Sequence, residues 1–207
     1  MDDPVHGLAT RVIAWGAYLR GALVILLGLR TFLGRRRFAV LHIDRGFLLT
    51  APEPALLVAA TWILCARAED AAGVGEAATA AALVGAALVV GGWLLILWTY
   101  ASWPSIFVGH ALLREHRLVT QGAYGVVRHP VYLGAFLIWL GLGVGFLSPA
   151  VLGIVILYVI PAYLLYVRDE EAMLEGAFGD GYRRYRQAVP RLVPRLGRGR
   201  RASVDRA

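Results

Sequence analysis

Lysine is absent from the 207-residue chain, and cysteine occurs only once. All 21 basic side chains are therefore arginines, and the formal net charge is +7. A single cysteine, Cys65, excludes an internal disulfide and a cysteine-based metal cluster. Charge is also scarce, because charged residues make up 17% of the chain and hydrophobic residues 58%. This balance and a mean hydropathy of +0.62 are typical of a protein that crosses a membrane several times.

Apolar runs long enough to cross a bilayer dominate the sequence. A transmembrane helix needs about 17–25 predominantly apolar residues. We predict an all-α integral membrane protein with about five such helices, at residues 12–33, 47–67, 77–101, 131–147 and 150–167. The last two are separated only by a Ser-Pro turn at 148–149, which predicts a tight helical hairpin.

Two spans contain residues that call for further interpretation. The first is interrupted by Arg20, which is either a buried functional cation or a sign that the helix begins after it. The third contains small residues at helical spacing, which permit close packing against another helix. These are Ala81, Gly85, Gly91 and Gly92.

The charges between the spans predict an orientation. Arginines occur at 34–46, at 102–130 and after Tyr182, whereas the connection at 68–76 is mainly acidic. Positive residues stay on the cytoplasmic side of a membrane. We therefore expect the plasma membrane (the inner membrane of a bacterium), with the N-terminus outside and the C-terminus in the cytoplasm. The arginines flank apolar spans, so the basic pI does not require a nucleic-acid partner, and no cleaved signal peptide is expected.

One cytoplasmic segment, "GAYGVVRHPVY" at residues 122–132, combines an arginine and a histidine with a helix start. Pro130 suits the first turn of a helix, where its missing N–H is no loss. Free backbone N–H groups at such a terminus, with Arg128 beside them, can hold a carboxylate or a phosphate. His129 by itself is explained equally well as a helix-start residue bonded to the backbone.

A second segment, "YVRDEEAMLEGAFGDGYRRYR" at residues 166–186, is acidic where the last span ends. Its three adjacent acids are Asp169, Glu170 and Glu171. Neighbouring carboxylates repel each other and oppose the dipole at a helix C-terminus, so they need a cation. Arg128, Arg168 or the ammonium group of a ligand would supply it; a solvated acidic turn is the alternative. A helix that continues to Phe178 and ends at Gly179 would remove part of the dipole objection.

The hairpin brings both segments to the same end of the last two spans. An anion receptor beside carboxylates suits a zwitterionic, water-soluble ligand that meets a lipophilic partner. The stretches "HRLVTQGAYGVVRHPVYLG" and "RDEEAMLEGAFGDGYRRYRQAVPRLVP" closely resemble the C-terminal half of the isoprenylcysteine carboxyl methyltransferase family and its phospholipid-methyltransferase relatives. The resemblance covers about residues 110–195 and implies transfer of a methyl group from S-adenosylmethionine, on the cytoplasmic side, to a lipophilic acceptor.

The resemblance also implies an organisation and a set of site residues. Residues 1–105 would hold the first three spans, 106–195 a methyltransferase-like core with the last two, and 196–207 a mobile, arginine-rich tail. The expected cofactor contacts are His116, Leu118, Val119, Tyr124, His129, Pro130, Tyr132, Glu170 and Glu171. The expected catalytic residues are Arg128, His129 and Glu170, and no metal is expected.

The acceptor stays open at this stage. Eukaryotic relatives carry a substrate-contacting arginine about one helical turn before the matched glutamate, where this chain has Tyr166, with Arg168 close by. These two are the expected substrate contacts. The acceptor is the carboxylate of a prenylcysteine-like molecule, or another lipid-like carboxylate, thiol or amine.

Two other functions fit parts of the pattern. Sterol-type reductases that use NADPH share an R-H-P-x-Y element, and three arginines after the last span are candidates for a nucleotide phosphate: Arg183, Arg184 and Arg186. Against this, Ala135 stands where those enzymes often carry a glutamate. The other alternative is a non-catalytic membrane protein that binds a lipid or a partner, although such a scaffold needs no carboxylates facing an anion receptor.

Overall fold

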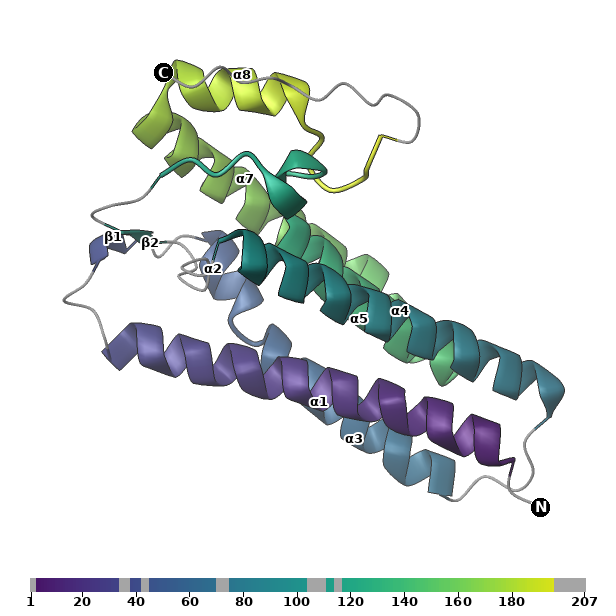
Figure 1. Cartoon of the computed structure of the whole chain (residues 1–207). Coiled ribbons are helices and arrows are strands. Elements are labelled where there is room, and N and C mark those ends of the chain that lie inside the picture. Colours follow the sequence, from purple (N-terminus) through teal and green to yellow (C-terminus); the bar gives the residue numbers. More distant parts are fainter. Residues whose placement is uncertain are drawn as a thin grey trace.

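The computed structural model describes residues 3–33, 38–41, 45–69, 75–103, 111–113 and 117–195. Within these ranges the chain is mostly helical, with one short two-stranded ribbon and irregular segments before α5 and after α8 (Figure 1). The helices are α1 (Pro4–Leu33), α2 (Arg45–Thr50), α3 (Glu53–Glu69), α4 (Glu76–Ser102), α5 (Pro130–Gly145), α6 (Pro149–Ile154), α7 (Ile160–Phe178) and α8 (Asp180–Ala188). Strands β1 (Phe38–Leu41) and β2 (Ala111–Leu113) pair antiparallel. The predicted all-α class is confirmed.

Four helical segments are long and apolar enough to cross a membrane. They are Pro4–Leu29, Leu48–Ala68, Glu76–Ser102 and Pro149–Phe178, and they correspond to the first, second, third and fifth predicted spans. The fourth predicted span corresponds to α5, which has 16 residues. At 1.5 Å per residue, α5 is about 24 Å long and falls short of a hydrocarbon core of about 30 Å. The chain is thus a helical membrane protein; a count of five spans and the orientation stay predictions.

Close packing of glycines joins α4 to α5. A Cβ atom at Gly92 would lie 2.6 Å from the carbonyl oxygen of Gly134, and one at Gly85 would lie 2.5 Å from Cα of Gly145. The backbones of the two helices therefore approach as closely as the small residues of α4 predicted. Gly91 differs, because a Cβ atom there would meet nothing within 4 Å.

The last span is a single helical segment that carries a π-helical turn, Val155–Val159, between α6 and α7. It begins with a cap at Ser148, whose Oγ accepts a hydrogen bond from the backbone N–H of Val151 at 3.3 Å. It ends at Phe178, where Gly179 adopts φ +52°, a conformation that favours glycine. The predicted continuation of this helix is confirmed, so the acidic cluster lies on helical backbone and not beyond a helix end.

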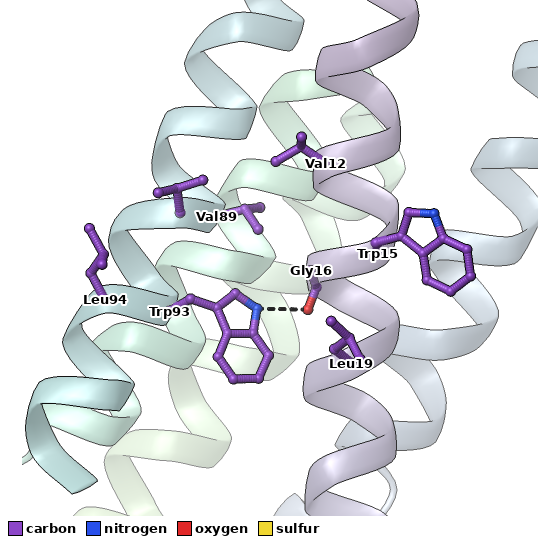
Figure 2. A pocket seen from close by; sticks show the side chains of 8 residues that line it. Val12, Trp15, Gly16, Leu19, Val89, Trp93 and Leu94 are labelled. Atoms are coloured by element: carbon purple, nitrogen blue, oxygen red, sulfur yellow. Dashed lines mark hydrogen bonds between the residues drawn. The ribbon is translucent and has the colours of Figure 1, made fainter. Parts of the chain in front are cut away.

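Helix α1 is anchored to its neighbours in two ways. Figure 2 shows Trp93 of α4, which donates from its indole nitrogen to the carbonyl oxygen of Gly16 at 3.0 Å, beside an apolar groove between the two helices. Arg20 lies within α1, which begins at Pro4, so the alternative that this helix begins after Arg20 is wrong. The guanidinium of Arg20 is buried and bonded to Glu53 of α3.

The neighbouring glycines of α4 provide a matched test of the α4–α5 contact. We expect Gly92→Ala to lower the free energy of unfolding by about 1–3 kcal/mol, because the added methyl group meets the backbone of α5. Gly91→Ala should leave stability unchanged or slightly raised, since alanine favours a helix. Thermal unfolding of both variants in detergent measures this, and equal effects of the two would contradict the packing described.

Candidate active site

The segment after α8 pairs with the residues in front of α5. The backbone N–H of Arg128 donates to the carbonyl oxygen of Pro190 at 2.8 Å, and that of His129 donates to the carbonyl oxygen of Arg191 at 3.1 Å. The Nη1 of Arg128 also donates to the carbonyl oxygen of Val189. These bonds fix both side chains of the Arg-His pair between the start of α5 and the C-terminal segment.

Glu171 of α7 is the anion at the centre of this arrangement, and only 4% of it is exposed. Arg128 donates from Nε and Nη2 to Oε1 of Glu171 at 3.0 and 2.7 Å. Arg191 donates from Nη2 to Oε2 at 2.6 Å and from Nε to Oε1 at 3.2 Å. The Nε2 of His129 lies 3.1 Å from Oε1. Two arginines and one histidine therefore surround one buried carboxylate, which meets the condition for burying a charge.

This arrangement identifies the cation that the acidic cluster requires. Of the two predicted arginines it is Arg128, which pairs with Glu171 of the same chain, and Arg191 joins it there. Arg168, the other candidate, lies outside the cluster: 74% of its side chain is exposed, and its Nε is 3.8 Å from Asp169. An exposed pair of this kind contributes little to stability.

His129 bridges the two neighbouring glutamates. Its Nδ1 lies 3.2 Å from Oε2 of Glu170, and its Nε2 faces Glu171. Burial by itself lowers the pKa of His129, but the hydrogen bonds to Glu170 and Glu171 outweigh burial and raise the pKa above its ordinary value. The imidazolium form, which donates from both nitrogens, is therefore favoured in this arrangement.

Tyrosine rings cover the side of His129 toward the apolar helices. The ring of Tyr132, in the first turn of α5, lies 5.7 Å from that of His129 and 5.3 Å from that of Tyr166, centroid to centroid. It also lies 5.8 Å from the ring of Tyr163. Aromatic pairs at such distances pack favourably, so the rings hold one another in place.

Tyr124 lies in the short 3₁₀ turn Gly122–Gly125 in front of α5. Its side chain is buried, and its hydroxyl has no hydrogen-bond partner among the described residues. Burial, and after it the charge of Glu170, raise the pKa of Tyr124. A buried polar atom without a partner is costly, so this hydroxyl is a candidate contact for a ligand.

The other predicted contacts are placed as follows. Leu118 and Val119 pack against the cluster of Tyr124 and the α8 tyrosines, Tyr182 and Tyr185. Pro130 is the first residue of α5, as predicted. His116 lies outside the described residues. The structure thus brings six predicted site residues together, and their roles stay predictions. They are Arg128, His129, Tyr132, Tyr166, Glu170 and Glu171.

Arg191 was not predicted as a site residue. Its only signal in the sequence is its place in "VPRLVP", the end of the second stretch that carries the resemblance, twenty residues after Glu171. Spacing alone does not indicate that the chain turns back after α8 and returns this arginine to α7.

Comparison with known proteins shows a family domain in just under half of the chain. Residues 80–181, from α4 to the start of α8, match the family model described as phospholipid methyltransferase. The chain carries a domain of the phospholipid methyltransferase family. The resemblance expected from the two motifs is thereby confirmed, and the match takes in the helices that carry the glutamates and the start of α5.

Three curated relatives match parts of the chain. Protein-S-isoprenylcysteine O-methyltransferase of Schizosaccharomyces pombe is 39% identical over 85 residues, which cover 39% of this chain and 34% of that protein. Protein-S-isoprenylcysteine O-methyltransferase B of Arabidopsis thaliana is 39% identical over 81 residues, or 39% and 41% of the two chains. The cobalt-zinc-cadmium resistance protein CzcN of Cupriavidus metallidurans is 32% identical over 94 residues, or 45% and 42%. The chain spans less than half the length of each relative, and no solved structure matches it significantly.

The bridging position of His129 predicts a pH dependence of stability. Because its pKa is raised in the folded protein, the stability it contributes is fully present below its unfolded pKa of about 6.5 and is lost as the pH rises through the folded value. The difference in unfolding temperature between the wild type and His129→Gln should therefore be largest in mildly acidic buffer and shrink on the alkaline side. Melting curves across a pH series measure it, and a difference that grows with pH would contradict the bridge.

Proposed function

We propose that the protein is an S-adenosylmethionine-dependent methyltransferase that transfers a methyl group to a lipophilic acceptor. The observation that carries the proposal is the cluster of His129, Glu170 and Glu171 at one end of the apolar helices, within the region that matches the family. The family domain and the two isoprenylcysteine O-methyltransferases among the relatives support the same reaction.

The residues present fit this cofactor. S-adenosylmethionine supplies, when bound, a methyl group on a positively charged sulfur, and it also carries an ammonium group and ribose hydroxyls. The side chain of Glu170 is 23% exposed, although its Oε2, which faces His129, is buried, so a cationic or hydroxyl group would reach the carboxylate at Oε1. The Tyr124 hydroxyl lacks a partner among the described residues and is influenced by the charge of Glu170. Glu170 and Tyr124 would hold the polar groups, with Leu118, Val119 and Tyr132 as the apolar wall.

The state of His129 supports a carboxylate acceptor. A thiol or an amine must lose a proton, which requires a base near the reacting atoms. Both nitrogens of His129 face glutamates, so neither is directed at an acceptor from which it could take a proton. A carboxylate needs no such base, so the contribution of this chain is to position the reactants and exclude water. The reaction named for the isoprenylcysteine O-methyltransferases is consistent with an oxygen acceptor of this kind.

The direction of approach differs for the two reactants. We propose that the site faces the cytoplasm, in a bacterial inner membrane with the N-terminus outside, as the distribution of arginines predicts. The cofactor then reaches the site past the C-terminal segment, and the acceptor reaches it from the bilayer. Tyr166, which is buried against Tyr132, is the proposed acceptor contact; Arg168, on the exposed surface, remains the second proposed contact.

The structure weakens the reductase alternative. Arg183 pairs with Glu175 at 2.8 Å and with Asp180 at 2.7 Å. Arg186 pairs with the other oxygen of Glu175 at 2.8 Å. These two arginines hold α8 against α7, so a nucleotide phosphate would have to displace both carboxylates.

Substitution of Glu170 tests the proposed cofactor site. Glu170→Gln should weaken binding of S-adenosylhomocysteine about tenfold or more, since a hydrogen bond to a charged group contributes roughly 1.5–3 kcal/mol. Glu175→Gln is the matched control, because it neutralises a glutamate of the same helix outside the cluster. Isothermal titration of the detergent-purified protein measures both. Unchanged affinity in folded Glu170→Gln would remove Glu170 from the site, and binding of NADPH instead of S-adenosylhomocysteine by the wild type would favour the reductase.

The acceptor is then identified with four probes, one for each class. They are S-farnesyl-N-acetylcysteine, palmitate, dodecanethiol and phosphatidylethanolamine. We expect radiolabelled methyl groups to pass from S-adenosylmethionine to one of the two carboxylates. Transfer to the thiol or the amine would require a base that the arrangement of His129 does not provide and would overturn the carboxylate assignment.

A further inference from the structure

A buried ion pair outside the proposed site joins four helices. Arg20 of α1 and Glu53, the first residue of α3, are only 7% and 2% exposed. The Nη1 of Arg20 lies 2.6 Å from both carboxylate oxygens of Glu53. Its Nη2 donates to the hydroxyl of Tyr163 on α7 at 2.9 Å, and the indole nitrogen of Trp139 on α5 donates to Oε1 of Glu53. We call these four residues the Arg20 network.

Stability alone does not explain the Arg20 network. Charges are expensive within the apolar part of a membrane protein, and both Arg20 and Glu53 lie in segments apolar enough to cross a membrane. Buried ion pairs can often be replaced by apolar residues of similar volume with no loss of stability, or even a gain. Neither residue touches the proposed cofactor contacts, and both lie before residue 80, where the family match begins.

Tyr163 connects the Arg20 network to the proposed site. Its ring lies 5.8 Å from that of Tyr132, which in turn contacts the rings of His129 and Tyr166. Tyr163 precedes Glu170 by seven residues on α7, so it lies about 10 Å from it along the helix axis, toward the apolar part of the bundle. The three tyrosines 132, 163 and 166 (the tyrosine stack) therefore lie between His129 and the Arg20 network.

We infer that Arg20 and Glu53 are positioning residues for the methyl acceptor: by holding the hydroxyl of Tyr163, they set the tyrosine stack against which the acceptor lies. This inference rests on the proposed function. The tyrosine stack meets the proposed cofactor contacts at Tyr132, whose hydroxyl is hydrogen-bonded to Glu170. Tyr163, the ring that Arg20 holds, lies one ring farther from Glu170, against Tyr132. Loss of the bond to Tyr163 should therefore impair acceptor binding and turnover while changing cofactor affinity little.

Removal of a single hydroxyl tests this inference. Tyr163→Phe keeps the ring and the ion pair but breaks the bond from Arg20 to the stack. Tyr158→Phe is the matched control, because it also removes a tyrosine hydroxyl from the last helical segment, one that donates to the carbonyl oxygen of Leu49 at 2.6 Å and lies outside the stack. With the probe that the wild type methylates best, kcat/KM of Tyr163→Phe should fall about tenfold, since small errors in position are costly in a reaction that depends on orientation. Its Kd for S-adenosylhomocysteine should stay within about twofold of the wild-type value, as in the control.

A second variant makes the test independent of how well Tyr163→Phe folds. Arg20→Met/Glu53→Met removes both charges together, so that neither is left buried without its partner. It should show the same loss of kcat/KM, again with wild-type affinity for S-adenosylhomocysteine, while Arg20→Lys retains part of the activity. Unchanged kcat/KM in the folded variants, or an equal loss of cofactor affinity, would overturn the inference. A wild type that binds no S-adenosylhomocysteine, or methylates none of the four probes, would overturn the proposed function and this inference with it.

Discussion

The carboxylate of Glu171 is the group on which the geometry of the site depends. A buried carboxylate is tolerated only when it is paired, and here the partners come from parts of the chain far apart in sequence. Arg128 and His129 stand before α5, and Arg191 follows α8. Pairing one carboxylate of α7 with all three therefore fixes the start of α5 and the C-terminal segment at the same time. The backbone bonds of Arg128 and His129 to the residues after α8 then follow, because the two segments already lie side by side.

Local signals made much of the fold predictable. The length of the apolar runs predicted five spans; four correspond to segments that are long enough to cross a membrane, and the remaining one corresponds to the shorter helix α5. Ser148 and Pro149 predicted the hairpin, and Gly179 the end of α7, because caps and glycine stops act within one or two turns. The rotation of a helix about its own axis was harder to predict from the sequence. Gly91 and Gly92 are neighbours of the same type, yet only Gly92 packs against the backbone of α5, which depends on how α4 lies against its neighbours.

The candidate site was predictable in its residue types and less so in its pairings. The R-H-P element and the adjacent glutamates marked the correct segments, but successive residues on a helix point about 100° apart, so the two glutamates differ in burial and in partners. The pairs of Glu171 with Arg191 and of Arg20 with Glu53 join residues 20 and 33 positions apart. Such pairs depend on how helices lie next to each other, and no spacing rule within one helix predicts them. The three-dimensional arrangement also changes the interpretation of Arg128. The sequence suggested that it binds an anionic group of a ligand, whereas in the structure it pairs with the carboxylate of Glu171.

The difference between the two glutamates has a consequence for how the proposed site works. Glu171 accepts hydrogen bonds from two arginines, so a ligand that took this carboxylate would have to break the contacts that hold the C-terminal segment in place. Glu170 lies one residue earlier with a partly exposed side chain, and its contact with His129 does not hold another segment of backbone. A cationic group of a ligand can therefore approach Glu170 while Glu171 keeps the architecture unchanged. His129 touches both carboxylates, so its charge depends on what lies beside Glu170: a second cation there disfavours the imidazolium and weakens the same bond that raises its pKa. Ligand binding at Glu170 and the protonation of His129, which bridges it to Glu171, are thus coupled by geometry.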